Sequence, residues 1–175
     1  MNFSRAQAID SIAAKCVRDN YAIKGVSIDS ILDSYEKYLI KEGYLGSRKE
    51  NRYSFFYQKM ARENAFIGMI PESIMSEISK VEIGKHMGGN CFNDLKSIHP
   101  DDIDGISKLF LLIQHYVKME KTYDAPKEMA QFMLDTFNED EFQSSFLRMQ
   151  VLLTIAWVSD LNRYPMPTLL PPIKN

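Results

Sequence analysis

A stripe of cationic and aromatic side chains between residues 48 and 62 has more chemical content than any other pattern in this sequence. The five residues that form it are Arg48, Arg52, Phe55, Lys59 and Arg62. On a helix with 100° per residue they fall within about 80° of one another. Guanidinium groups bind phosphate or carboxylate through a planar two-pronged contact, and an outward aromatic ring can stack on a base. The stripe is therefore a candidate surface for binding phosphate groups or an acidic partner.

A solvated polar face is the competing interpretation of the same stripe, because charged residues on a helix often serve only solubility. Glu50 and Glu63 can pair with the cations locally, and Phe55 can tuck under a neighbouring helix. The sequence leaves both interpretations open.

A helix-turn-helix is a more specific form of the binding interpretation. The turn over 43–47 is short enough to join two helices in that motif, which places residues 47–55 in the recognition position. Arg48, Lys49 and Arg52 then lie at the N-terminal end of the recognition helix, where base edges are reached. The modest overall charge and an acidic second half of the chain weigh against a nucleic-acid-binding protein.

The segment 82–100 holds four residues of metal-ligand type. They are His86, Cys91, Asp94 and His99. Their spacing matches none of the recurrent zinc patterns, and Cys91 as a nucleophile would need a histidine base held within hydrogen-bond reach. We therefore expect no metal, no cofactor and no catalytic residue, and the role of this loop stays open.

Helical periodicity runs through most of the chain, and strand alternation is absent. We expect helices that begin near Ser4, near Ser27 and at Pro71, a helix over 47–64 that opens with a Ser47–Glu50 capping box, a long helix from Pro100, one from about Asp124–Pro126 and one over 141–161. The last is apolar on nearly every side and should lie at the centre.

These elements predict an all-α, irregular single-domain bundle of about six to eight helices with a buried C-terminal helix. Residues 1–163 are expected to form the domain. Residues 164–175 hold four prolines, which predicts an extended tail that packs on the domain or extends away from it.

Composition indicates a globular protein, with 45% hydrophobic and 25% charged residues and a net charge of −2. The longest strictly apolar run, over 109–113, is far below the roughly 20 residues of a membrane span. Cys16 and Cys91 are far apart in sequence, and we expect two unpaired thiols in a reducing cytoplasm.

Absence of recurrent catalytic motifs favours a non-enzymatic function. We expect a helical protein-interaction module, such as an inhibitor, an immunity or antitoxin protein, an adaptor or an assembly subunit, which binds another protein. The alternative is a nucleic-acid-binding module. For either function the expected binding residues are Arg48, Lys49, Arg52, Phe55, Lys59 and Arg62.

Overall fold

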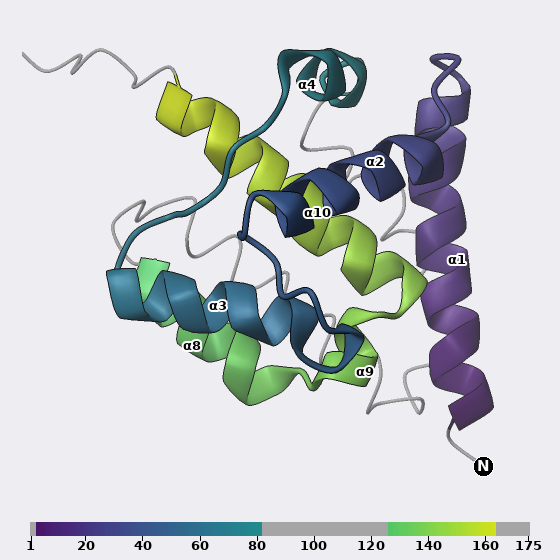
Figure 1. Cartoon of the computed structure of the whole chain (residues 1–175). Helices are drawn as coiled ribbons and strands as arrows, with labels where there is room; N and C mark the ends of the chain where they lie inside the picture. The colour runs from purple at the N-terminus through teal and green to yellow at the C-terminus, as the bar shows by residue number, and fades with distance from the viewer. Residues whose placement is uncertain (1–2, 82–125, 164–175) are drawn as a thin grey trace, which may run out of the picture.

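The computed structural model describes residues 3–81 and 126–163, and every regular element in those two ranges is helical (Figure 1). The elements are α1 (Phe3–Ala22), α2 (Ile28–Lys41), the 3-10 helix η1 (Lys49–Asn51), α3 (Arg52–Glu63), α4 (Glu72–Ile78), α8 (Pro126–Thr136), α9 (Glu139–Phe142) and α10 (Ser145–Arg163). The prediction of an irregular all-α bundle is confirmed. The loop 82–100, the helix expected from Pro100 and the tail 164–175 lie outside the described residues, so the proposed division at residue 163 stays a prediction.

Helix α10 forms the centre of the described bundle, as its all-round apolar sequence predicts. Between residues 146 and 159 only Arg148 and Trp157 are not buried. Helix α1 packs along one side of α10, and α2, α4 and α9 contact it as well. In Figure 1, α10 passes behind α2 and ends on the far side of the bundle from α1. The predicted buried C-terminal helix is thus present.

The predicted start of that helix at Glu141 is wrong. Asn138 and Glu141 form a capping box, in which each side chain bonds the backbone amide of the other residue, and this box starts the separate short helix α9. A turn at residues 143–144 follows, and α10 begins at Ser145. The acidic segment 138–141 is thus a helix start, but the helix that it starts has one turn only.

Helices α3 and α8 pack along each other and enclose an aromatic cluster. The Tyr57 and Phe142 rings stack with centroids 5.5 Å apart, and Phe56 meets Tyr57 edge-on at 5.1 Å. Tyr53 and Phe137 also contact Phe142. The face of α3 opposite Phe55 and Arg62, which bears Tyr53, Phe56, Tyr57 and Met60, is therefore buried.

The predicted start of the third helix at Ser47 is wrong as well. The chain from residue 46 to 51 folds back, with the Gly46 amide donating to the Arg52 carbonyl at 3.0 Å, and η1 precedes α3. Gly46 is required there, because a Cβ at this position would lie 2.9 Å from the Asn51 carbonyl oxygen. No Ser47–Glu50 capping box forms.

The first two helices begin close to the predicted positions near Ser4 and Ser27. Ser27 is the N-cap of α2, and Gly43 after the helix adopts a left-handed conformation with φ of 72°. Ile12 of α1 is 42% exposed, because the buried face of that helix bears Ala13, Ala14, Val17 and Tyr21 instead.

Cys16 is disulfide-bonded, so the prediction that it is an unpaired thiol is wrong. The sequence has one other cysteine, Cys91, which lies outside the described residues. The expectation of a reducing compartment loses this support. Among the described helices, none is both long and apolar enough to cross a membrane.

Candidate functional site

The predicted cationic stripe divides into two groups once the tertiary contacts are known. Arg62 and Phe55 face outward from α3: the Arg62 side chain is 74% exposed, and Phe55 is one of four exposed large hydrophobic residues in the described part of the chain. Arg52 and Lys59 instead turn toward other parts of the protein. A helical wheel placed all of them on one face, and contacts from other elements separated them.

Arg48 and Lys49 lie at η1, immediately before α3. Both side chains are exposed, and neither is ion-paired with another residue of the described ranges. The backbone there is anchored, because Gln143 donates its side-chain amide to the Lys49 carbonyl at 2.7 Å. Two unpaired cations are thus presented from a backbone that α9 holds in place.

Lys59 is occupied by its own chain. Its ammonium donates to the Gly43 carbonyl at 3.3 Å and lies 5.2 Å from the centroid of the Tyr44 ring. Both contacts stabilise the end of α2 and the turn that follows it, since a cation near a helix C-terminus satisfies carbonyl groups and complements the dipole. Lys59 is a structural residue in this conformation and does not reach outward.

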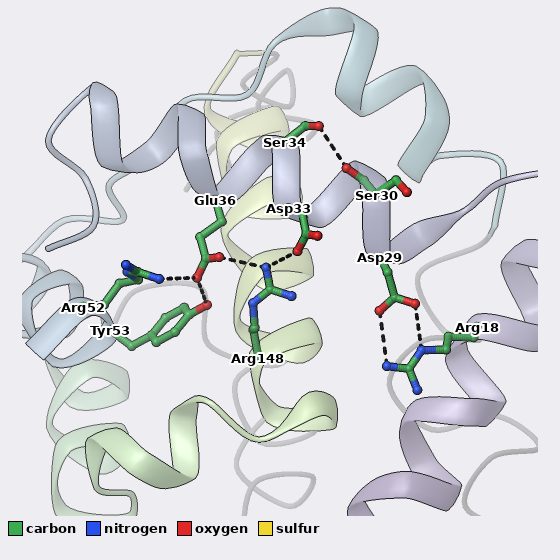
Figure 2. A network of polar contacts seen from close by, with 9 residues as sticks. All are labelled: Arg18, Asp29, Ser30, Asp33, Ser34, Glu36, Arg52, Tyr53 and Arg148. Carbon is green, nitrogen blue, oxygen red and sulfur yellow. Dashed lines mark hydrogen bonds and ion pairs between the residues drawn. The ribbon is translucent and has the colours of Figure 1, made fainter. Parts of the chain in front are cut away.

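Arg52 points to Glu36, the central acceptor of a partly buried network (Figure 2). The Glu36 carboxylate accepts from Arg148 at 2.8 Å, from the Tyr53 hydroxyl, and from Arg52 at 3.5 Å. Arg148 also donates to Asp33 at 2.6 Å. The network joins α2 and α3 to α10, and its contacts with α10 link residues more than 110 positions apart in sequence.

The electrostatics of this network favour a structural role over catalysis. Burial alone would raise the pKa of Glu36, but hydrogen bonds from Arg148 and Tyr53 outweigh it and hold the pKa below its ordinary value. Burial and the same carboxylate raise the pKa of Tyr53. A carboxylate with a lowered pKa is a poor general base, and a phenol with a raised pKa is a poor nucleophile at neutral pH.

The N-terminal amides of α3 are capped by a residue that sequence analysis did not connect to them. The Glu139 carboxylate accepts from the amides of Tyr53 and Ser54, each at 3.0 Å. Asp10 does the same for α10, accepting from Ser145 at 3.0 Å and Phe146 at 2.8 Å. N-cap motifs are recognised in a sequence from residues within one turn of the helix start. A carboxylate more than 80 positions away therefore cannot be predicted to cap a helix from the sequence.

These contacts do not fit the expected helix-turn-helix. The connection between α2 and α3 spans residues 42–51 and includes η1, whereas the motif uses a turn of three or four residues. Helix α3 packs mainly on α8, and a carboxylate occupies its N-terminus. The prediction of a short turn over 43–47 is therefore wrong, and Arg52 is turned inward toward Glu36.

The remaining exposed groups are Arg48 and Lys49 at η1 and Phe55 and Arg62 on α3, which we name together the η1–α3 face. Residues 48–63 hold five cations and two carboxylates, a net charge of +3 in a chain of net charge −2. The nearby carboxylates are Glu50 and Glu63, and the latter lies 3.7 Å from Arg62. Positive charge is thus concentrated on one segment of an acidic protein.

Two further features of the described residues concern the binding of small molecules and of metal ions. One cavity between α3, α8 and α10 has a volume of about 10 Å³ and is lined almost entirely by apolar side chains, room for at most one water. In the described ranges no group of three or more His, Cys, Asp or Glu residues could hold a metal ion. The four ligand-type residues of the 82–100 loop lie outside those ranges.

Comparison with protein-family models, with curated proteins and with solved structures finds no match for this chain.

Proposed function

We propose that this protein is a non-enzymatic helical interaction module that binds another protein through the η1–α3 face. The observation that carries the proposal is the position of Phe55, which is 37% exposed on the same outward side as Arg62 and follows the unpaired Arg48 and Lys49. Aromatic residues and arginine are enriched in protein interfaces and contribute most of their binding energy.

Protein binding fits this face better than nucleic-acid binding. Nucleic-acid affinity depends on many phosphate contacts, and a protein of net charge −2 that presents three outward cations on this face provides few of them. A partner protein needs only a central anchor that becomes desolvated and a few charged contacts around it. Phe55 supplies the anchor, and the cations supply the surrounding contacts.

Photo-crosslinking from the face itself tests the proposal. A benzophenone amino acid at position 55 should capture a specific protein in host cells, while the same probe at Gln131, exposed on α8, should not. Adding Arg48→Glu and Arg62→Glu should abolish the crosslink, and the matched control Lys127→Glu should leave it unchanged. Identical crosslinking from both positions, or none from position 55, would rule the proposal out.

The predicted cytoplasmic location needs its own test, because its argument from unpaired thiols no longer applies to Cys16. Disulfides persist chiefly in oxidising compartments. Cell fractionation, with alkylation of thiols before lysis, distinguishes the two settings: a cytoplasmic protein is recovered with Cys16 reduced and alkylated, and one from an oxidising compartment is recovered with Cys16 protected.

A further inference from the structure

Arg52 is the least satisfied charged group in the Glu36 network. Its single contact, from a terminal nitrogen to Glu36, is 3.5 Å long, and its buried Nε–H has no hydrogen-bond partner. Arg148, by comparison, bonds Glu36 at 2.8 Å and Asp33 at 2.6 Å. A buried donor without a partner is unfavourable, and a guanidinium normally engages a carboxylate through two parallel bonds. Arg52 therefore holds its inward position weakly.

Glu36 does not depend on Arg52. The carboxylate keeps the guanidinium of Arg148 and the hydroxyl of Tyr53 if Arg52 leaves, and both contacts are shorter than the one that is lost (Figure 2). The Glu36 side chain is 12% exposed, so it would remain a paired and largely buried carboxylate. If Arg52 moves away, the network loses only its longest contact, the one between Arg52 and Glu36.

Arg52 also lies at the edge of the η1–α3 face. It is the first residue of α3, one turn before Phe55 and directly after η1, and 23% of its side chain is already exposed. A rotamer change is enough to bring its guanidinium beside Phe55, because residues three apart on a helix are neighbours. The face would then have a planar two-pronged donor next to its aromatic anchor.

We infer that the partner of this face is an acidic protein segment whose carboxylates flank an apolar side chain, and that binding draws Arg52 away from Glu36 onto one of those carboxylates. The inference rests on the function proposed above. Charge complementarity supports it, because the face presents three exposed cations, Arg48, Lys49 and Arg62, against the carboxylates of Glu50 and Glu63, and Arg52 would add a fourth cation. A nucleic acid, with a charge every ~1.7 Å of duplex, would meet the acidic remainder of the chain as well, whereas a short segment contacts the face alone.

Arginine side-chain NMR on the full chain tests the inference with a defined probe. The probe is an acetylated peptide of glutamates around one phenylalanine, and a single-stranded oligothymidylate is the comparison ligand. We expect the peptide to shift the Arg52 Nε–H resonance, assigned by its loss in Arg52→Lys. Arg52→Lys should weaken binding about tenfold through loss of the two-pronged contact. Glu36→Gln should strengthen binding, because it weakens the competing acceptor.

The control Lys127→Ala, on α8, should leave peptide affinity unchanged, and thermal unfolding of each variant checks that it is folded. Three results would overturn the inference: no peptide binding at millimolar concentration, peptide binding with Arg52 unmoved and Arg52→Lys neutral, or preferential binding of the oligothymidylate. If one of these results is obtained and a partner is still crosslinked at position 55, the protein binds a partner through this face, but that partner is not an acidic segment. Absence of any crosslink would reject the function itself.

Discussion

Arg148 on α10 and Glu36 on α2 form a hydrogen-bonded ion pair at 2.8 Å that lies largely away from solvent, with side chains 20% and 12% exposed. The two residues are 112 positions apart in the chain. Their contact ties the central helix to the helix that crosses it, and it leaves Glu36 as the acceptor that also receives Tyr53 and Arg52.

Removal of Arg148 should destabilise the fold strongly. Arg148→Ala leaves a largely buried carboxylate without its main partner, and breaking such pairs costs about 3 kcal/mol. Urea unfolding measures the change. Asp33→Asn removes the more exposed partner of the same guanidinium, with a side chain 57% exposed, and should cost less than about 1 kcal/mol. Equal losses in the two variants would contradict the central role of Glu36.

Replacing both members of the pair by apolar residues should recover much of that loss. In Glu36→Leu/Arg148→Met no uncompensated charge remains, and apolar replacements of buried ion pairs are often neutral or stabilising. The free energy of unfolding of the double variant should exceed that of Arg148→Ala. If it does not, the loss in Arg148→Ala comes from packing and not from an unpaired carboxylate.

The Glu36 network should make stability depend on pH in the acid range. Because the pKa of Glu36 is lower in the folded protein than its ordinary value of 4.5, the unfolded chain binds the proton more readily. The stabilisation is thus complete above pH 4.5 and is lost as pH falls through the lower folded pKa. Unfolding free energies of wild type and Glu36→Gln should converge as pH falls below 4.5. A constant difference between them would exclude Glu36 as the titrating group.

The cap that Glu139 places on α3 should stabilise the protein measurably. Glu139→Ala removes the acceptor for the Tyr53 and Ser54 amides, and loss of an N-cap acceptor typically costs about 1 kcal/mol. Asp140→Ala is the matched control, since it is the adjacent exposed carboxylate in the same first turn of α9. Denaturant unfolding should show a clearly larger effect at position 139, and similar effects at both positions would argue for a general dipole contribution instead.

Gly68 should tolerate no side chain. A Cβ at this position would lie 2.5 Å from the Ser159 hydroxyl oxygen and 3.0 Å from a methyl group of Ile155, and its φ is +149°. Gly68→Ala should therefore cost about 2 kcal/mol or more through the clash with α10 and backbone strain. Gly43→Ala has positive φ but open space around it, and should cost only about 1 kcal/mol. Thermal or urea unfolding would rank the two, and the reverse order would contradict the close approach to α10.

Much of the fold could be predicted from the sequence because helical periodicity and turn residues are local signals. The inward face of α3, the stop at Gly43 and the central position of the C-terminal apolar helix all follow from residues within a few turns of one another. Helix boundaries were less predictable. Ser47 has the residue pattern of a cap, but the remote carboxylate of Glu139 supplies the acceptor, and the helix begins five residues later.

The candidate site shows most clearly the difference between what local sequence signals predict and what long-range contacts decide. The sequence by itself determined that Arg52, Phe55, Lys59 and Arg62 share one side of a helix, because their spacing is a property of the helix alone. Arg48, predicted on the same helix, lies before η1 in an extended conformation. Only the tertiary structure decided which of them face outward. Glu36 draws in Arg52, and the Gly43 carbonyl and Tyr44 ring hold Lys59, through contacts with other segments that folding brings close and that no periodicity records.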